Sequence, residues 1–151
     1  MAVNNPKVLI AGAGPVGLTL ANELARHGVP IHIIDKAPQR TDKSKALVMW
    51  SRTLELFDDA GYVGPFLAAG RRGTGAQIST GKEIIARMSL DSIDSRYPFA
   101  LMIPQSETER VLEEQLAARG IAVDRQVELT SFAETGDKVE ATIKKADGGT
   151  E

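Results

Sequence analysis

Three glycines and one acid are the residues of this 151-residue chain whose types and spacing indicate binding chemistry. Gly12, Gly14 and Gly17 form the pattern G-x-G-x-x-G, which lets a backbone approach a pyrophosphate at the start of a helix. Asp35 follows at about the spacing at which a carboxylate reaches a ribose 2′-hydroxyl, and its charge would repel a 2′-phosphate. The four residues therefore predict a site for an unphosphorylated ADP-ribose type of nucleotide.

The chain alternates strands and helices in the order of an open parallel sheet. Apolar, β-branched runs at residues 7–11 and 31–35 predict two buried parallel strands, and residues 121–123 predict a third that follows a crossover helix. Glycine turns predict antiparallel hairpins within residues 76–88 and 127–145. The predicted fold class is α/β, a Rossmann-like parallel sheet with crossover helices and a β-meander that is incomplete at the C-terminus.

The helix between the first two strands would position the phosphates. It begins at Pro15, where the missing N–H would have no partner in any case, and stops at Gly28. Its free N–H groups and positive dipole end would face an anion. Val16, Leu20 and Leu24 recur every four residues and predict one apolar stripe against the sheet. A glycine-rich turn that only packs a helix on a sheet is the alternative interpretation.

A polar, basic segment follows the second strand. It contains Arg40 and Lys43 and leaves the edge of the sheet where ligands bind in open α/β folds. These cations either neutralise a pyrophosphate or are solvated loop charges, and we favour the second interpretation. Ser51 then predicts the N-cap of a short helix over residues 52–60.

Composition excludes several kinds of protein. Hydrophobic residues make up 42% and charged residues 25%, which are ordinary values for a soluble globular protein. The net charge of −2 gives no reason to propose nucleic acid as a partner, and the lack of cysteine excludes disulfides and thiolate catalysis. No apolar run is long enough to span a bilayer, and the N-terminal stretch lacks the basic start of a signal peptide. We therefore expect a cytoplasmic protein with no membrane partner.

Catalytic groups are not evident in the sequence. It contains no Gly-x-Ser-x-Gly motif, no carboxylate pair that stands out as an acid–base couple, and no cluster with metal-ligand spacing. The two histidines, His27 and His32, are best interpreted as structural. Any chemistry must therefore be carried by the bound nucleotide cofactor.

Several motifs, in this order, resemble the N-terminal part of the class A flavoprotein monooxygenases. These are single-component FAD enzymes typified by para-hydroxybenzoate hydroxylase and the aromatic polyketide hydroxylases. The motifs lie at residues 8–18, 34–36, 44–47, 52–57 and 104–110. The resemblance spans essentially the whole chain and implies that residues 1–151 form an FAD-binding domain.

The resemblance also implies which residues contact FAD. Glycine-loop residues Gly12, Gly14, Pro15, Val16 and Gly17 would hold the pyrophosphate, Asp35 the ribose, Leu129 the adenine, Gln105 the ribityl chain and Val48 the flavin ring, with Lys36 and Ala46 as further contacts. Lys45 stands where the family usually has an arginine near the pyrophosphate, a change that keeps the charge but loses the guanidinium fork. No catalytic residue is implied for this part of the chain.

The family continues, beyond the length of this chain, into an Asp-Gly motif, a Gly-Asp motif and a substrate-binding sheet, which are not present here. The resemblance therefore implies the FAD-binding front of a longer enzyme, truncated within its β-meander. The complete enzyme would use NADPH or NADH to reduce FAD and would hydroxylate a small aromatic substrate. We expect this chain alone to be inactive.

Three other interpretations stay open. In the first, the chain is the FAD-binding part of another flavoenzyme, such as a halogenase or a dehydrogenase. In the second, it is a non-catalytic NAD-binding module. In the third, it is a stable fragment with no cofactor. Residues 45–55 argue against the NAD module, because a simple NAD domain has no evident need for them. In addition, unpaired strand edges predict self-association.

Overall fold

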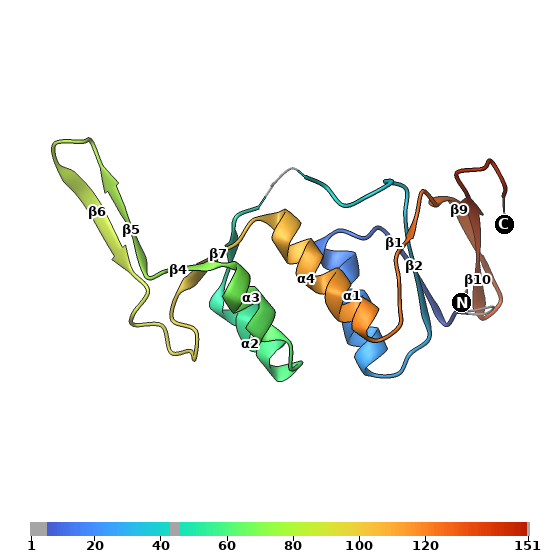
Figure 1. Cartoon of the computed structure of the whole chain (residues 1–151), viewed down its shortest axis with the longest axis horizontal. Helices are drawn as coiled ribbons and strands as arrows, with labels where there is room; N and C mark the ends of the chain where they lie inside the picture. The colour runs from blue at the N-terminus through green and yellow to red at the C-terminus, as the bar shows by residue number, and fades with distance from the viewer. Residues whose placement is uncertain (1–5, 43–45, 151) are drawn as a thin grey trace. The chain divides into compact units, whose positions relative to one another are not determined.

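A computed structural model describes residues 6–42 and 46–150 of the chain. Of these residues, 6–42 and 109–150 form one compact unit, and 46–108 form a second. Figure 1 labels helices and strands of both units, where there is room.

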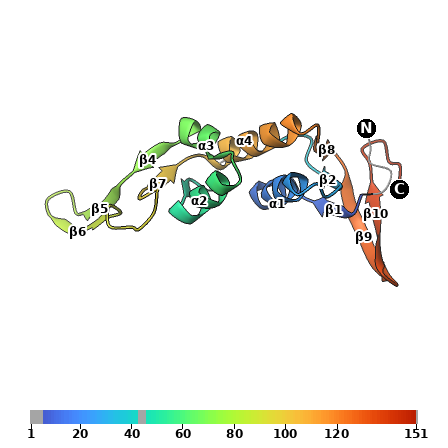
Figure 2. The ribbon, with the colours of Figure 1, turned by 90° about the horizontal axis from the view of Figure 1, so that it is seen from below.

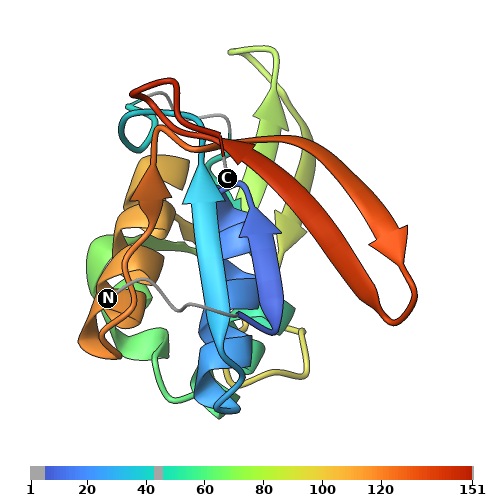
Figure 3. The ribbon, with the colours of Figure 1, turned by 90° about the vertical axis from the view of Figure 1, so that its right-hand side faces the viewer.

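The first unit is built on a parallel sheet. Its strands are β1 (Val8–Ala11), β2 (Ile31–Asp35) and β8 (Asp124–Arg125), in the order β1-β2-β8, and Figure 3 shows the three arrows side by side and pointing the same way. Helix α1 (Pro15–Arg26) joins β1 to β2, and α4 (Gln105–Ala118) precedes β8. The predicted α/β fold with a parallel sheet and crossover helices is confirmed.

The third strand begins later than predicted. The prediction placed it at residues 121–123, but the pairing with β2 involves Asp124 and Arg125. The reason lies at the end of α4, where Gly120 takes a φ of +76° and the Ile121 N–H donates to the Leu116 carbonyl at 3.1 Å. Because that amide completes the helix end, it is not available to a sheet.

The sheet of the first unit is covered on both faces. Helix α1 and the 109–118 part of α4 lie on one face, and the hairpin of β9 (Glu128–Thr135) and β10 (Lys138–Lys144) lies on the other, as Figures 1 and 2 agree. On the hairpin side, Ile34 forms a buried cluster with Val127 and Ile143. The predicted C-terminal hairpin is confirmed, and its pairing extends to a single bridge between Lys144 and Thr150.

Helix α1 buries a different side from the predicted one. Val16 is 84% exposed and Leu20 46% exposed, whereas Leu18, Ala21 and Asn22 are buried. The Asn22 side-chain amide donates to the carbonyls of Leu18, at 2.9 Å, and Leu112, at 3.0 Å. The predicted apolar stripe is therefore wrong, because α1 must face α4 as well as the sheet.

The second unit contains a small antiparallel sheet, two helices and a hairpin. The elements are β3 (Val48–Met49), α2 (Ser51–Asp59), α3 (Val63–Ala69), β4 (Arg71–Gly73), β5 (Gly75–Ser79), β6 (Ile84–Ser89) and β7 (Ala100–Met102). The sheet order is β3-β7-β4. The rings of Phe57, Tyr62 and Phe66 pack with centroids 4.7–6.3 Å apart and form part of the core of this unit.

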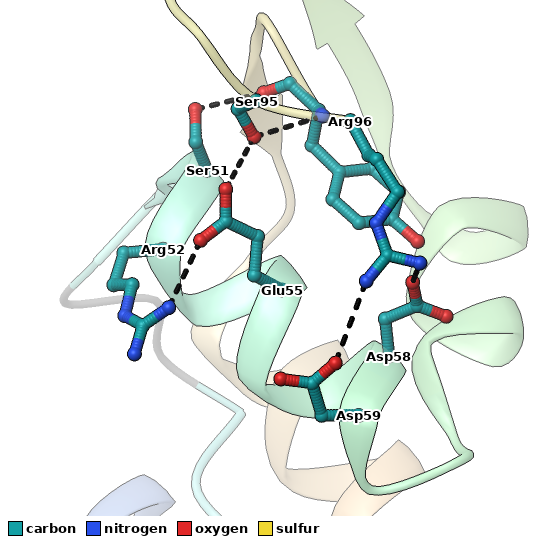
Figure 4. A network of polar contacts seen from close by, with 8 residues as sticks. Ser51, Arg52, Glu55, Asp58, Asp59, Ser95 and Arg96 are labelled. Atoms are coloured by element: carbon teal, nitrogen blue, oxygen red, sulfur yellow. Dashed lines mark hydrogen bonds and ion pairs between the residues drawn. The ribbon is translucent and has the colours of Figure 1, made fainter.

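Polar contacts bind the loop that precedes β7 to helix α2 (Figure 4). The helix begins at Ser51, so this residue is not the predicted N-cap, and its hydroxyl donates instead to the Tyr97 carbonyl at 2.7 Å. The Ser95 hydroxyl donates to the Glu55 carboxylate at 2.6 Å, and Arg96 pairs with Asp58 at 2.8 Å. The loop therefore has several independent attachments to one helix.

The hydrogen bond from Ser95 predicts a pH-dependent contribution to stability. It is the main cause that holds the pKa of Glu55 below the ordinary value of 4.5, and Arg52 adds to it. A carboxyl whose pKa is lower in the folded state contributes stability above its unfolded pKa and loses it as the pH falls through the folded pKa. We therefore expect Ser95→Ala to lower the urea midpoint at pH 7 and the difference from the unmodified chain to shrink below pH 4.5.

Urea unfolding at pH 7, pH 5 and pH 3 tests this expectation. Ser92→Ala removes an exposed hydroxyl from the same loop and should leave the midpoint unchanged at each pH. A difference between Ser95→Ala and the unmodified chain that is as large at pH 3 as at pH 7 would rule out the Glu55 carboxylate as its source.

The hairpin of β5 and β6 is exposed along its whole length. The predicted pairing is confirmed, with Ala76 opposite Met88 and Ile78 opposite Ala86. Ile78 is 62% exposed and Ile85 66% exposed. Two strands alone rarely form a stable sheet in water, so this hairpin carries apolar surface that remains available for contact.

Candidate functional site

The glycine loop joins the end of β1 to the start of α1. Gly12 has a φ of +111°, which side chains rarely allow, and its N–H donates to the Ile34 carbonyl at 2.8 Å. A Cβ on Gly17 would overlap the Gly12 carbonyl oxygen. Gly14 differs, because its φ of −80° suits any residue and a Cβ there would meet no atom within 4 Å. The fold requires glycine at positions 12 and 17 and leaves open space at position 14.

The N-terminus of α1 is suited to an anion. Gly14 caps the helix without a side-chain hydrogen bond, Pro15 is the first helical residue, and the first turn holds no acid. The N–H groups of this turn have no partner within the helix, and they add to the positive end of its dipole. Backbone groups in this arrangement are a common phosphate-binding site.

Asp35 lies at the end of β2 and holds the glycine loop. Its Oδ2 accepts a hydrogen bond from the Ala13 N–H at 2.6 Å, and its Oδ1 accepts one from the Ala37 N–H at 2.8 Å. The side chain is 17% exposed. Because each carboxylate oxygen has two lone pairs, both oxygens can still accept from a further donor. Asp35 therefore shapes the loop and can also receive a hydroxyl group.

A pocket of about 310 Å³ opens where these parts meet. Four residues predicted as cofactor contacts line it, namely Gly12, Asp35, Lys36 and Leu129. They come from three separate segments, the ends of β1 and β2 and the start of β9. Lys36 is largely exposed and its ammonium lies 3.9 Å from Glu128, so it faces solvent at the rim. The structure thus brings four of the predicted cofactor contacts together.

Three further predicted contacts lie in the second unit. The Gln105 N–H donates to the Ala46 carbonyl at 3.0 Å, and Val48 pairs with Met102 across β3 and β7. Val48 is 39% exposed and Met102 44% exposed, which leaves apolar surface beside them. Lys45 lies outside the described residues. The predicted site residues therefore form two groups, one in each unit.

An ion-pair network beside Asp35 was not predicted from the sequence. Arg125 Nη1 lies 3.7 Å from Asp35 Oδ2, and its Nη2 donates to Glu113, which also pairs with Arg40 Nε at 2.8 Å. Arg40 is therefore not the solvated loop charge that was favoured. A signal did exist, since Arg125 lies two residues after the end of the predicted third strand and so belongs at the same edge of the sheet as Asp35.

The geometry defines a class of protein. A parallel strand–helix–strand unit with a glycine loop at the helix N-terminus and an acid at the end of the second strand is a dinucleotide-binding domain of the Rossmann type. The chain belongs to the FAD binding domain family, whose sequence model matches residues 5–151. Among the described helices, none is both long and apolar enough to cross a membrane.

Named relatives agree with this family. The chain is 39% identical over 150 residues to the 6-methylpretetramide 4-monooxygenase of Streptomyces rimosus, covering 98% of this chain and 27% of that protein. It is 36% identical over 112 residues to the pentachlorophenol 4-monooxygenase of Sphingobium chlorophenolicum, covering 74% of this chain and 21% of that protein. The chain thus spans about a quarter of the length of these relatives.

A solved structure gives the same answer. The anhydrotetracycline hydroxylase OxyS from Streptomyces rimosus superposes with a TM-score of 0.80 at 31% identity, covering 95% of this chain and 29% of that one. The resemblance to class A flavoprotein monooxygenases that the motifs indicated is therefore confirmed.

Proposed function

We propose that this chain is the FAD-binding part of a longer flavin-dependent monooxygenase that hydroxylates a small aromatic substrate and takes electrons from NADPH or NADH. The observation that carries the proposal is a glycine loop that is open at Gly14, together with a pocket lined by Gly12 and Asp35. The names of the relatives support the activity, since they are monooxygenases. The aromatic substrate and the reductant are parts of the same proposal.

The residues of the first unit fit the ADP half of FAD. The N–H groups at the start of α1, with Pro15 and Val16, would hold the pyrophosphate. Asp35 would accept a ribose hydroxyl, and the main chain of Leu129 would contact the adenine. Lys36 at the rim would add positive charge near the phosphates. The open space at Gly14 is what a phosphate needs in order to reach the backbone.

The residues of the second unit would serve the flavin half. Val48 and Ala46 would lie near the flavin ring, and Gln105 and Lys45 would contact the ribityl chain and the pyrophosphate. When bound, FAD would supply the redox chemistry, and the described residues would bind and orient it. We propose no catalytic residue in this chain, and we expect it to hydroxylate nothing unaided.

A titration with separate nucleotides tests the proposal. Trp50 is the single tryptophan of the chain and is 53% exposed, so its emission reports flavin binding by energy transfer. When FAD binds, we expect saturable quenching of both the Trp50 emission and the flavin fluorescence. In a calorimetric titration with NAD, we expect a weaker heat of binding. Binding of NAD alone would favour the non-catalytic nicotinamide module. Binding of neither ligand by a chain folded by circular dichroism would favour the fragment without a cofactor.

The remaining partners and the location are also proposals. We propose no nucleic-acid or membrane partner, in line with the net charge of −2. The ordinary composition and the lack of cysteine support a cytoplasmic location, which cell fractionation would test. The exposed apolar residues of the hairpin β5–β6 support self-association, and sedimentation at several concentrations would measure it.

A further inference from the structure

We propose that Arg125, anchored by Glu113, is a positioning residue for the ribose of the cofactor, because it fixes the Asp35 carboxylate in the orientation that receives a ribose hydroxyl. This inference rests on the proposed FAD-binding function. It assigns to Arg125 a role in nucleotide recognition that does not require contact with the nucleotide.

The register of the sheet places the two side chains together. Asp35 and Arg125 are direct partners in the parallel pairing of β2 with β8, so their side chains stand on the same face. Arg125 Nη1 lies 3.7 Å from Asp35 Oδ2, which is the oxygen that also accepts the Ala13 N–H. Both side chains are less than one-fifth exposed, at 18% for Arg125 and 17% for Asp35. The pair is therefore only weakly screened by solvent.

The backbone after Arg125 holds this arrangement. Gln126 has a φ of +59°, the only positive φ of a non-glycine residue among the residues that the structure describes. Two backbone hydrogen bonds hold this turn: the Gln126 N–H donates to the Ala37 carbonyl at 3.4 Å, and the Val127 N–H donates to the Asp35 carbonyl at 3.1 Å. Such a backbone conformation is strained and persists only where the surroundings enforce it. The turn that follows Arg125 is therefore hydrogen-bonded to the chain segment that carries Asp35.

The charges around Arg125 argue against direct contact with a phosphate. One terminal nitrogen donates to Glu113 and the other faces Asp35, so both ends of the guanidinium point at carboxylates. Arg40 pairs with the second oxygen of Glu113 at 2.8 Å, which makes the four groups neutral as a set. A neutral set suits the uncharged ribose, whereas an anion would have to compete with two carboxylates for Arg125.

Fixing the carboxylate lowers the cost of binding. Each oxygen of Asp35 already accepts one backbone N–H, so only the remaining lone pairs can meet a ribose hydroxyl. Without Arg125, the carboxylate would keep one fewer partner and would be freer to reorient. Groups held in the bound orientation before the ligand arrives give higher affinity, because less ordering is needed on binding.

The experiment compares FAD with analogues built from 2′-deoxyadenosine and 3′-deoxyadenosine. Dissociation constants are measured by flavin fluorescence for the unmodified chain, Arg125→Gln, Glu113→Gln and the control Arg119→Gln, an exposed arginine directly after α4 that donates to the Gln115 carbonyl. For the unmodified chain, we expect the analogue that lacks the hydroxyl received by Asp35 to bind about tenfold more weakly than FAD, because a hydrogen bond to a charged group is lost. In Arg125→Gln we expect this ratio to fall to about twofold, and in Arg119→Gln to stay at about tenfold.

The ratio separates a positioning role from a structural one. A general loss of structure would weaken FAD and both analogues equally, and an unchanged ratio in Arg125→Gln would overturn the inference. The same holds if neither analogue binds the unmodified chain more weakly than FAD. Glu113→Gln loosens Arg125 without removing it, so it gives the same test if Arg125→Gln fails to fold by circular dichroism. No binding of FAD to the unmodified chain would instead overturn the proposed function, and this inference with it.

Discussion

Gly14→Val is expected to abolish FAD binding while the chain stays as stable as before. The backbone at Gly14, with φ −80° and ψ −176°, is extended and accepts a valine, and a Cβ there meets no protein atom within 4 Å. The same side chain would fill the space through which a pyrophosphate reaches the loop. We expect the dissociation constant for FAD to rise by at least about a hundredfold, or about 2.7 kcal/mol.

Flavin fluorescence gives the affinity for this variant, and urea unfolding gives the stability. Gly64→Ala is a matched control, because it also adds a Cβ that meets no atom, but in helix α3 of the second unit. Its affinity for FAD should equal that of the unmodified chain. Retained FAD affinity in Gly14→Val would show that the pyrophosphate does not bind at this loop.

Gly17→Ala is expected to destabilise the fold itself. The added Cβ would overlap the carbonyl oxygen of Gly12, a backbone atom that cannot move aside as a flexible side chain can. Overpacking of this kind costs about 3 kcal/mol when the backbone must shift. For a domain of this size that corresponds to a fall in melting temperature of roughly 6–12 °C.

Differential scanning calorimetry measures the effect, and Gly14→Ala serves as the control at the same helix start. The control should melt within about a degree or two of the unmodified chain, since its Cβ occupies open space. If Gly17→Ala melted together with Gly14→Ala, the close approach of α1 to β1 would not be what requires glycine at position 17.

Local patterns were sufficient for the parts of the site that lie close together in the sequence. The glycine loop, the first two strands and the acid that ends the second strand occupy 29 consecutive positions, from Lys7 to Asp35, and each carries its own signal. The two hairpins were also predicted, because a glycine turn between alternating runs is a local feature. Four predicted contacts then met at one pocket, since the strand ends of a parallel sheet converge.

Features that depend on distant partners were missed or misplaced. The side of α1 that is buried depends on α4, so the spacing of Val16 and Leu20 gave the wrong face. Ser51 has the residue type of an N-cap, yet its hydroxyl is drawn to Tyr97, about 46 positions away. Arg40 and Arg125 meet over Glu113, a carboxylate on α4 whose orientation no local rule specifies.

The place of β8 in the chain has a consequence for how the site is assembled during folding. Paired residues of β1 and β2 are about 23 positions apart in the sequence, whereas paired residues of β2 and β8 are about 90 positions apart. A loop about four times as long costs roughly 1.2 kcal/mol more to close, by two doublings of length. On the ribosome, the glycine loop and Asp35 are made before the second unit, and Arg125 emerges only after the whole of it. The nucleotide site is thus begun before the second unit is synthesised and completed after it.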